Sequence, residues 1–194
     1  MGIKRCRILF LSGMLWLVGC SDPSWQTKDI SGLMPPLKFE LTNEEAQPVS
    51  EADYAGDVTL LFFGFTHCPH ICPTTLAKLA TVLQALGEDA SEDLRILFVS
   101  VDPARDDPAT LREYTQAFGP EFIGLTGNEE ALQALTRRYR VTYGYGEKDD
   151  KGQYDVSHSN AVFAFDRNGD AQLLIREEDA QEAIVADLAR LLAN

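Results

Sequence analysis

Two continuous apolar runs dominate the pattern of hydrophobic and polar positions along the chain. Residues 58–65 read VTLLFFGF, and residues 94–101 form a second run rich in Leu, Ile, Phe and Val. Such runs are typical of short strands that are buried on both faces of a sheet. A helical pattern follows each run, over 74–86 and 108–118. Strand and helix therefore alternate as in a crossover unit, which predicts a partly parallel sheet.

The C-terminal part of the chain predicts a helix, a hairpin and a last helix. Residues 128–139 have helical spacing, with Asn128 as the cap. Two short apolar segments, 161–165 and 171–175, flank an Asp-Arg-Asn-Gly-Asp turn and predict a β-hairpin. An amphipathic helix is predicted over 178–192. The order of elements predicts one α/β domain of the thioredoxin-like type, with a mixed central sheet flanked by helices and a hairpin insertion.

The N-terminus has the pattern of a secretory signal peptide over 1–19. A short basic stretch precedes an apolar run, 8–18, that is too short to span a bilayer as a stable helix. The run ends in Leu-Val-Gly followed by Cys20, which resembles the bacterial lipoprotein processing box. Cys20 is therefore predicted to be a lipid anchor. An ordinary signal peptide would instead leave Cys20 as a free exported thiol.

The residues after the predicted anchor are poor in periodic patterns. Residues 20–37 contain three prolines and Gly32 and are predicted to be the lipidated N-terminus and a tether. The folded domain is predicted over 38–194. A hydrophobic content of 45% fits a domain with a substantial core.

The charge balance is acidic. The 194 residues include 30 Asp and Glu against 17 Lys and Arg, and the formal net charge is −13. Removal of the signal would take away three basic residues and no acidic one. Nucleic acid is therefore a poor partner, and most of the acidic surface is expected to be solvated. Such a surface could also favour a cationic protein or a metal ion.

Cysteine usage narrows the chemistry to one pair. Of four cysteines, Cys6 lies in the predicted signal and Cys20 is the predicted anchor, which leaves Cys68 and Cys72. In an oxidising compartment two such thiols tend to form a disulfide unless a metal or a reductant prevents it. The pair stands between a predicted strand and a predicted helix. The free N–H groups of a first helical turn are expected to lower the pKa of a thiol there.

The spacing of the pair suits chelation. With three residues between them, the two cysteines can place Cβ atoms about 5–6 Å apart on one face. A structural disulfide prefers a Cβ separation of roughly 3.5–4.5 Å. Two thiolates select soft or borderline ions, chiefly Cu(I) and Zn(II), which need a further ligand such as imidazole. The chain has three histidines, His67, His70 and His158, and spacing alone does not select among them.

Three blocks of the chain, in matching order and spacing, resemble the Sco/SenC family of copper-binding proteins. The first is GFTHCPHICPTTL at 64–76, and the second is VSVDPARDDP at 99–108. The third is the His158-Ser159 pair, which precedes an apolar strand and the turn at 166–169. The resemblance extends from Phe39 to the end of the chain.

The resemblance implies a thioredoxin-like fold that binds one copper ion through Cys68, Cys72 and His158. It implies a metallochaperone rather than a turnover enzyme, serving assembly of the dinuclear copper site of cytochrome c oxidase as a copper donor, a thiol reductant, or both. The implied partners are the copper-acceptor subunit of the oxidase and a thioredoxin-like reductant or another copper chaperone. The implied location is the periplasmic side of a bacterial membrane, held by the N-terminal lipid.

Two positions depart from the family pattern. His70 and Ser157 stand where the family usually has aspartate, which removes negative charge near the site. Asp102 either supports the ligands or simply forms a turn with Pro103. Three tyrosines form either a partner-facing loop or a surface hairpin: Tyr143, Tyr145 and Tyr154.

Three other functions use the same cysteines. A thiol–disulfide oxidoreductase would attack a partner disulfide with one thiolate and resolve the product with the other, although its motif is more often CxxC. Such an enzyme would not need His158. A peroxidase of the same fold would have a PxxxTxxC motif, which is absent. A zinc site completed by His67 or His70 would strain the geometry, because His67 and Cys68 are adjacent.

Overall fold

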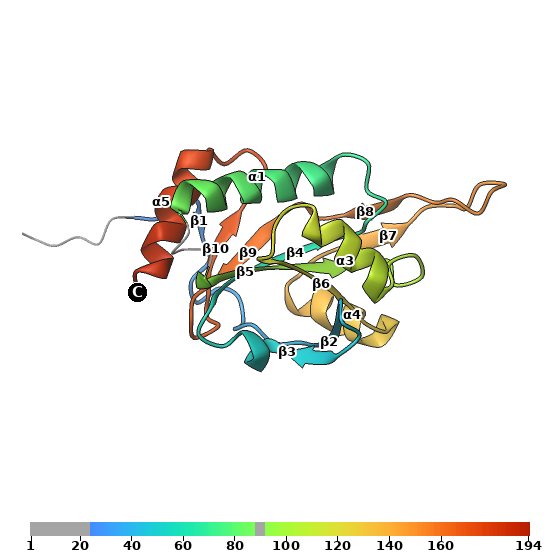
Figure 1. Ribbon diagram of the computed structural model, residues 1–194, viewed down its shortest axis with the longest axis horizontal. Helices are drawn as coiled ribbons and strands as arrows, with labels where there is room; N and C mark the ends of the chain where they lie inside the picture. The colour runs from blue at the N-terminus through green and yellow to red at the C-terminus, as the bar shows by residue number, and fades with distance from the viewer. Residues whose placement is uncertain (1–23, 88–91) are drawn as a thin grey trace, which may run out of the picture.

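The computed structural model describes residues 24–87 and 92–194, which form an eight-stranded sheet with helices on both faces (Figure 1). The sheet order is β1-β10-β9-β4-β5-β6-β2-β3. The sheet strands are β1 Lys28–Asp29, β2 Glu40–Asn43, β3 Pro48–Ser50, β4 Val58–Gly64, β5 Leu94–Ser100, β6 Phe122–Thr126, β9 Val162–Phe165 and β10 Ala171–Ile175. The helices are η1 Glu51–Tyr54, α1 Ile71–Leu86, α3 Pro108–Gln116, α4 Glu129–Arg138 and α5 Gln181–Leu192. A separate antiparallel hairpin consists of β7 Tyr143–Tyr145 and β8 Val156–His158.

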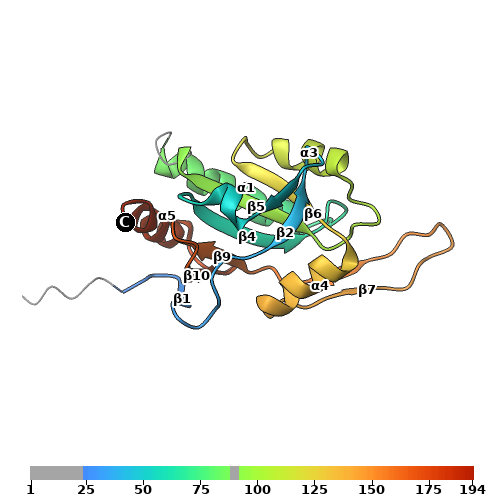
Figure 2. The same cartoon turned by 90° about the horizontal axis from the view of Figure 1, so that it is seen from below.

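The mixed character of the sheet explains how the helices are distributed. β4, β5 and β6 are parallel neighbours, and the other pairs are antiparallel. Because the β4–α1–β5 and β5–α3–β6 crossovers advance in the same direction, right-handed connections place α1 and α3 on the same face. α5 packs beside α1, and α4 lies across the opposite face (Figures 1 and 2). The predicted thioredoxin-like α/β fold and its partly parallel sheet are confirmed.

The two apolar runs form the centre of the core. All seven residues of β4 are buried, and in β5 only Arg95 is partly exposed. Aromatic side chains pack on both faces of these strands: Phe62 lies tilted against Phe98, and Phe63 lies edge-to-face against Phe163. Burial of each such side chain contributes about 2 kcal/mol to the free energy of folding. The two strands therefore form a stable base for a site at their C-terminal ends.

Helix boundaries follow local chemistry. α1 begins three residues before the predicted start and therefore includes Cys72 and Pro73 in its first turn, and it ends at Gly87, which has φ 92°. The Asn128 side chain accepts a hydrogen bond from the Ala131 N–H, as predicted for a cap. α5 begins later than predicted. The Asp179 carboxylate accepts a hydrogen bond from the Arg176 N–H and so forms a turn, and α5 begins only after this turn.

The segment from Trp25 to Leu37, predicted to belong to a tether, is part of the folded domain. β1 pairs with β10, and Ile30 and Leu37 are buried. The Asp187 carboxylate of α5 accepts hydrogen bonds from the Gln26 N–H and from the N–H and hydroxyl of Thr27, at 2.7–3.1 Å. The prediction failed here because a two-residue strand has no periodic pattern.

The predicted signal peptide at 1–19 and the predicted lipid anchor Cys20 lie outside the described residues. Within the described part of the chain, no helix combines the length and apolar character needed to cross a membrane.

Alkaline pH is expected to destabilise the domain. Burial, followed by the nearby Asp53 carboxylate, raises the pKa of Tyr54 from 10.0 to about 12. Between those values the unfolded chain loses this proton first, so the free energy of unfolding should fall as pH rises, by up to about 1 kcal/mol per pH unit. Urea unfolding between pH 8 and pH 11 tests this. Tyr54→Phe should flatten the decline, and an identical slope in both proteins would contradict it.

Candidate metal centre

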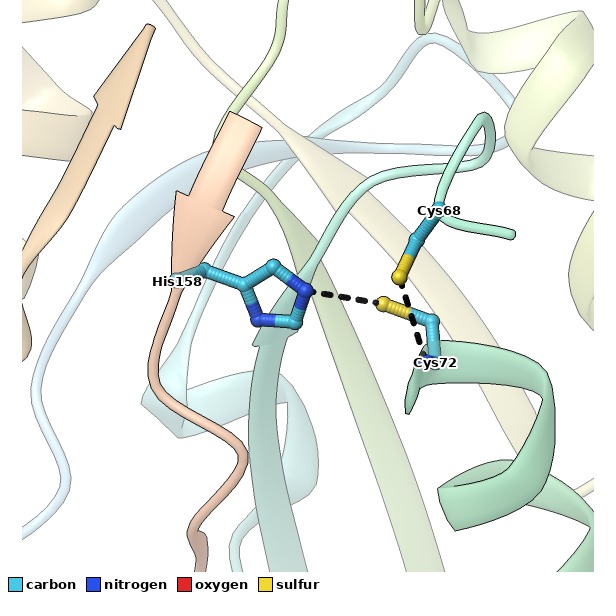
Figure 3. Close-up of side chains that lie close together, drawn as sticks. All are labelled: Cys68, Cys72 and His158. Carbon is cyan, nitrogen blue, oxygen red and sulfur yellow. Dashed lines mark hydrogen bonds between the residues drawn. The ribbon is translucent and has the colours of Figure 1, made fainter. Parts of the chain in front are cut away.

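The centre lies where β4 ends and α1 begins. The chain leaves β4 at Gly64 and turns through residues 65–70, and the Cys68 N–H donates to the carbonyl of Phe65 at 3.1 Å. The Cys72 N–H then donates to the Cys68 Sγ at 3.4 Å (Figure 3). The turn and the first helical residues thus hold the two sulfurs on the same side of the loop.

The third group comes from the β7–β8 hairpin. His158 is the last residue of β8, and its imidazole points toward the two cysteines (Figure 3). The distance from His158 Nε2 to Cys72 Sγ is 3.4 Å. One ligand atom from each of Cys68, Cys72 and His158 can be chosen so that all three lie within 4.8 Å of one another. The fold therefore brings together the three residues that the resemblance singled out.

The tautomer of His158 leaves Nε2, the nitrogen that faces the cysteines, without a proton. His158 Nδ1 lies 2.8 Å from the backbone carbonyl oxygen of Ser159, which can only accept a hydrogen bond. The proton therefore belongs on Nδ1, and Nε2 presents its lone pair to the cysteines. The ring packs edge-on against Phe65 and Phe62, with centroid distances of 5.7 and 6.1 Å.

Burial dominates the protonation of Cys72. Its side chain is fully buried, whereas Cys68 is 9% exposed. Desolvation raises the pKa of the Cys72 thiol, a backbone hydrogen bond from Phe65 only partly opposes this, and Cys68 adds to the rise. The prediction that the first helical turn lowers this pKa is wrong for Cys72 in the metal-free protein. A bound cation would favour the thiolate, because its charge replaces the lost solvation.

The other two histidines lie apart from this group. His67 is exposed, and its Nδ1 is 3.1 Å from the hydroxyl oxygen of Thr66 and 3.7 Å from an Asp106 oxygen. His70 is exposed at the start of α1 and lines a cavity of about 150 Å³. Among the described residues, neither belongs to the Cys-Cys-His group. Ser157 is exposed, and its hydroxyl donates to the Gly144 carbonyl.

Two buried carboxylates support the surrounding loops. Asp102 accepts a hydrogen bond from the Tyr154 hydroxyl at 2.6 Å and forms an ion pair with Arg105. Asp106 was not singled out from the sequence. It accepts hydrogen bonds from the Thr66 N–H at 2.9 Å, the Thr66 hydroxyl at 2.6 Å and the Ser100 hydroxyl at 2.6 Å. The sequence DPARDD at 102–107 shows that acidic residues follow β5, but it does not show which loop their side chains contact.

The donor set fits a soft ion of low coordination number. Two thiol sulfurs and one imidazole nitrogen converge, whereas a closed structural zinc site uses four protein ligands. The set therefore leaves a coordination position for an exchanging group. Together, fold and site define a thioredoxin-like domain with a Cys-Cys-His group that could bind copper.

The chain belongs to the SCO1/SenC family, whose family model matches residues 35–193. The chain is 39% identical over 158 residues to the mitochondrial SCO2 homolog protein of Mus musculus, covering 80% of this chain and 61% of that protein. The corresponding Bos taurus protein is 41% identical over 132 residues, covering 68% of this chain and 50% of that protein. The chain thus spans only half to three fifths of these relatives.

Two similar solved structures contain copper. ScoI from Arabidopsis thaliana with copper bound has a TM-score of 0.75 at 32% identity, covering 81% of this chain and 98% of that chain. ScoI from Bradyrhizobium japonicum with copper bound has a TM-score of 0.73 at 36% identity, covering 81% of this chain and 99% of that chain.

Proposed function

We propose that this protein binds one copper ion through Cys68 Sγ, Cys72 Sγ and His158 Nε2. The observation that supports the proposal most directly is the convergence of these three groups, because Cys72 and His158 are 86 positions apart in sequence. The two thiols are free in the structure. Thiolate and imidazole are the ligands that copper in its lower oxidation state prefers.

Copper is cargo in this proposal, destined for the dinuclear copper site of cytochrome c oxidase. The family membership supports this destination, and the copper-bound relatives support copper as the cargo. Three protein ligands leave room for an incoming cysteine or histidine of the acceptor, so copper can move by stepwise ligand exchange. Cys68, the more exposed of the two thiols, is the ligand that an acceptor would reach first.

The proposal includes an extracytoplasmic location. A lipid on Cys20 would hold the domain at the periplasmic face of a bacterial membrane. The acceptor is a subunit of the oxidase, and a thioredoxin-like reductant or another copper chaperone would supply thiols or copper.

A second candidate function is reduction of the acceptor's cysteines by the same thiol pair. The closeness of the two free thiols favours it, because a resolving thiol must reach the mixed disulfide formed by its neighbour. The two functions differ in their need for His158. Thiol exchange with copper excluded should survive His158→Ala, whereas copper binding should not.

A competition titration tests copper binding. Reduced protein would be titrated anaerobically with Cu(I) against a chromophoric chelator. Since loss of a mere supporting residue typically costs roughly 10–100-fold in metal affinity, Cys68→Ala, Cys72→Ala and His158→Ala should each cost at least about 100-fold.

His67→Ala and His70→Ala are the matched controls and should retain the affinity of the unsubstituted protein. Circular dichroism would verify that each variant is folded. Full Cu(I) affinity in folded His158→Ala would overturn the three-ligand site and leave thiol exchange as the better assignment.

A further inference from the structure

The hairpin that presents His158 has little of its own to hold it in place. β7 and β8 pair only with each other and form no ladder with the main sheet. The hairpin and the loop that joins its strands extend away from the body of the domain (Figures 1 and 2). An isolated two-stranded hairpin is at best marginally stable in water. The position of His158 must therefore depend on contacts between the hairpin and the domain.

Val156 is buried in the core and Tyr143 packs against it, while the hydrogen bonds of Tyr145 and Tyr154 to the domain converge on the loop that follows β5. The Tyr154 hydroxyl donates to Asp102 Oδ1 at 2.6 Å, and Arg105 Nη1 donates to the Tyr154 carbonyl at 3.0 Å. The Tyr145 hydroxyl donates to the Val101 carbonyl at 2.6 Å. Tyr145 at the end of β7 and Tyr154, two residues before β8, are thus both tied to one short segment of the domain, residues 101–105.

Arg105 links this segment to the wall of the metal centre. Its guanidinium carbon lies 3.8 Å from the Tyr154 ring centroid and 5.6 Å from the Phe65 ring centroid. The Phe65 ring contacts the imidazole of His158 edge-on. The Arg105 side chain is only 16% exposed, and its charge is compensated by the buried carboxylate of Asp102. Desolvation strengthens both the ion pair and the cation–π contact.

We propose that Asp102, Arg105 and Tyr154 form a latch that positions His158 against the cysteine pair. The latch residues are positioning residues, because they act through the hairpin and Phe65 rather than on the metal. This inference rests on the proposed function, in which His158 is a copper ligand. When these contacts break, the hairpin can move His158 away from the cysteine pair, and the site then has only its two thiols. The apparent copper affinity therefore scales with the fraction of molecules in which the latch is closed.

A double-mutant cycle separates this role from general stabilisation. Tyr154→Phe removes the hydroxyl bound to Asp102 and keeps the ring under Arg105. It should lower Cu(I) affinity about tenfold in the unsubstituted protein, as expected for loss of a partly buried hydrogen bond to a charged group. In a His158→Ala background the same change should have no effect. Tyr143→Phe is the matched control, because its hydroxyl makes none of these contacts.

A second readout needs no copper. In the metal-free full chain, amide hydrogen exchange at β7 and β8 should accelerate about tenfold in Tyr154→Phe and in Arg105→Lys, while exchange in β4 and β5 stays unchanged. Arg105→Lys keeps the charge but loses the planar fork.

The outcomes are distinguishable. An equal loss of affinity in both backgrounds, or unchanged hairpin exchange, would overturn the latch. Full copper affinity in His158→Ala alone would overturn the proposed function, and with it the role of the latch in copper binding. Hydrogen exchange would then still show whether the latch restrains the hairpin.

Discussion

Gly64→Ala should both destabilise the fold and disrupt the cysteine pair. A Cβ atom at this position would lie 2.6 Å from Cys72 Sγ and 2.6 Å from Cε2 of Phe98. Both neighbours are fully buried, so neither can move into open space. Overpacking of this kind typically costs about 1–3 kcal/mol, and we expect a loss near the upper end in the free energy of unfolding. Displacement of the sulfur from His158 should also lower Cu(I) affinity at least about tenfold.

Gly146→Ala is the matched control, because a Cβ there would meet its nearest neighbour, the Asp155 carbonyl oxygen, at an ordinary 3.4 Å. Urea unfolding of the metal-free proteins and the Cu(I) competition titration give the two values. If both variants matched the unsubstituted protein in stability and affinity, close packing of the strand against Cys72 would not be a requirement of the site.

The sequence predicted the elements whose pattern is strong and local. The apolar runs became β4 and β5, and Gly87 and Asn128 end and begin helices as predicted. β2, β3 and β6 were missed. β2, for example, alternates buried positions with one exposed and one partly exposed position over only four residues. Short strands such as these form because a neighbouring strand is present, and no window of their own sequence shows this.

The site residues also divide into those with a local sequence signal and those without one. The spacing of Cys68 and Cys72 was informative, because one strand–helix junction positions both residues. His158 had no local signal and was selected only by family resemblance. The contacts of Asp106 with Thr66 span 40 positions. The Cys72 pKa was predicted in the wrong direction, because a helix start is visible in sequence whereas burial depends on the whole fold.

Asp106→Ala should have the second large effect. The fully buried carboxylate accepts three hydrogen bonds, two from Thr66 and one from Ser100, and so joins the loop after β4 to the end of β5. Removal leaves buried donors without an acceptor, and we expect a loss of about 3 kcal/mol in the free energy of unfolding. Because Thr66 stands two residues before Cys68, Cu(I) affinity should fall roughly tenfold as well.

Asp107→Ala is the neighbouring control. Asp107 is exposed and caps α3 by accepting from the Thr110 N–H at 2.8 Å, so its loss should cost about 1 kcal/mol and leave copper affinity unchanged. Asp106→Asn keeps the shape and one acceptor oxygen and should fall between the two. If Asp106→Ala and Asp107→Ala weakened copper binding equally, Asp106 would act only through the start of α3. A loss confined to Asp106 would mean that the carboxylate holds the loop from which Cys68 reaches the metal.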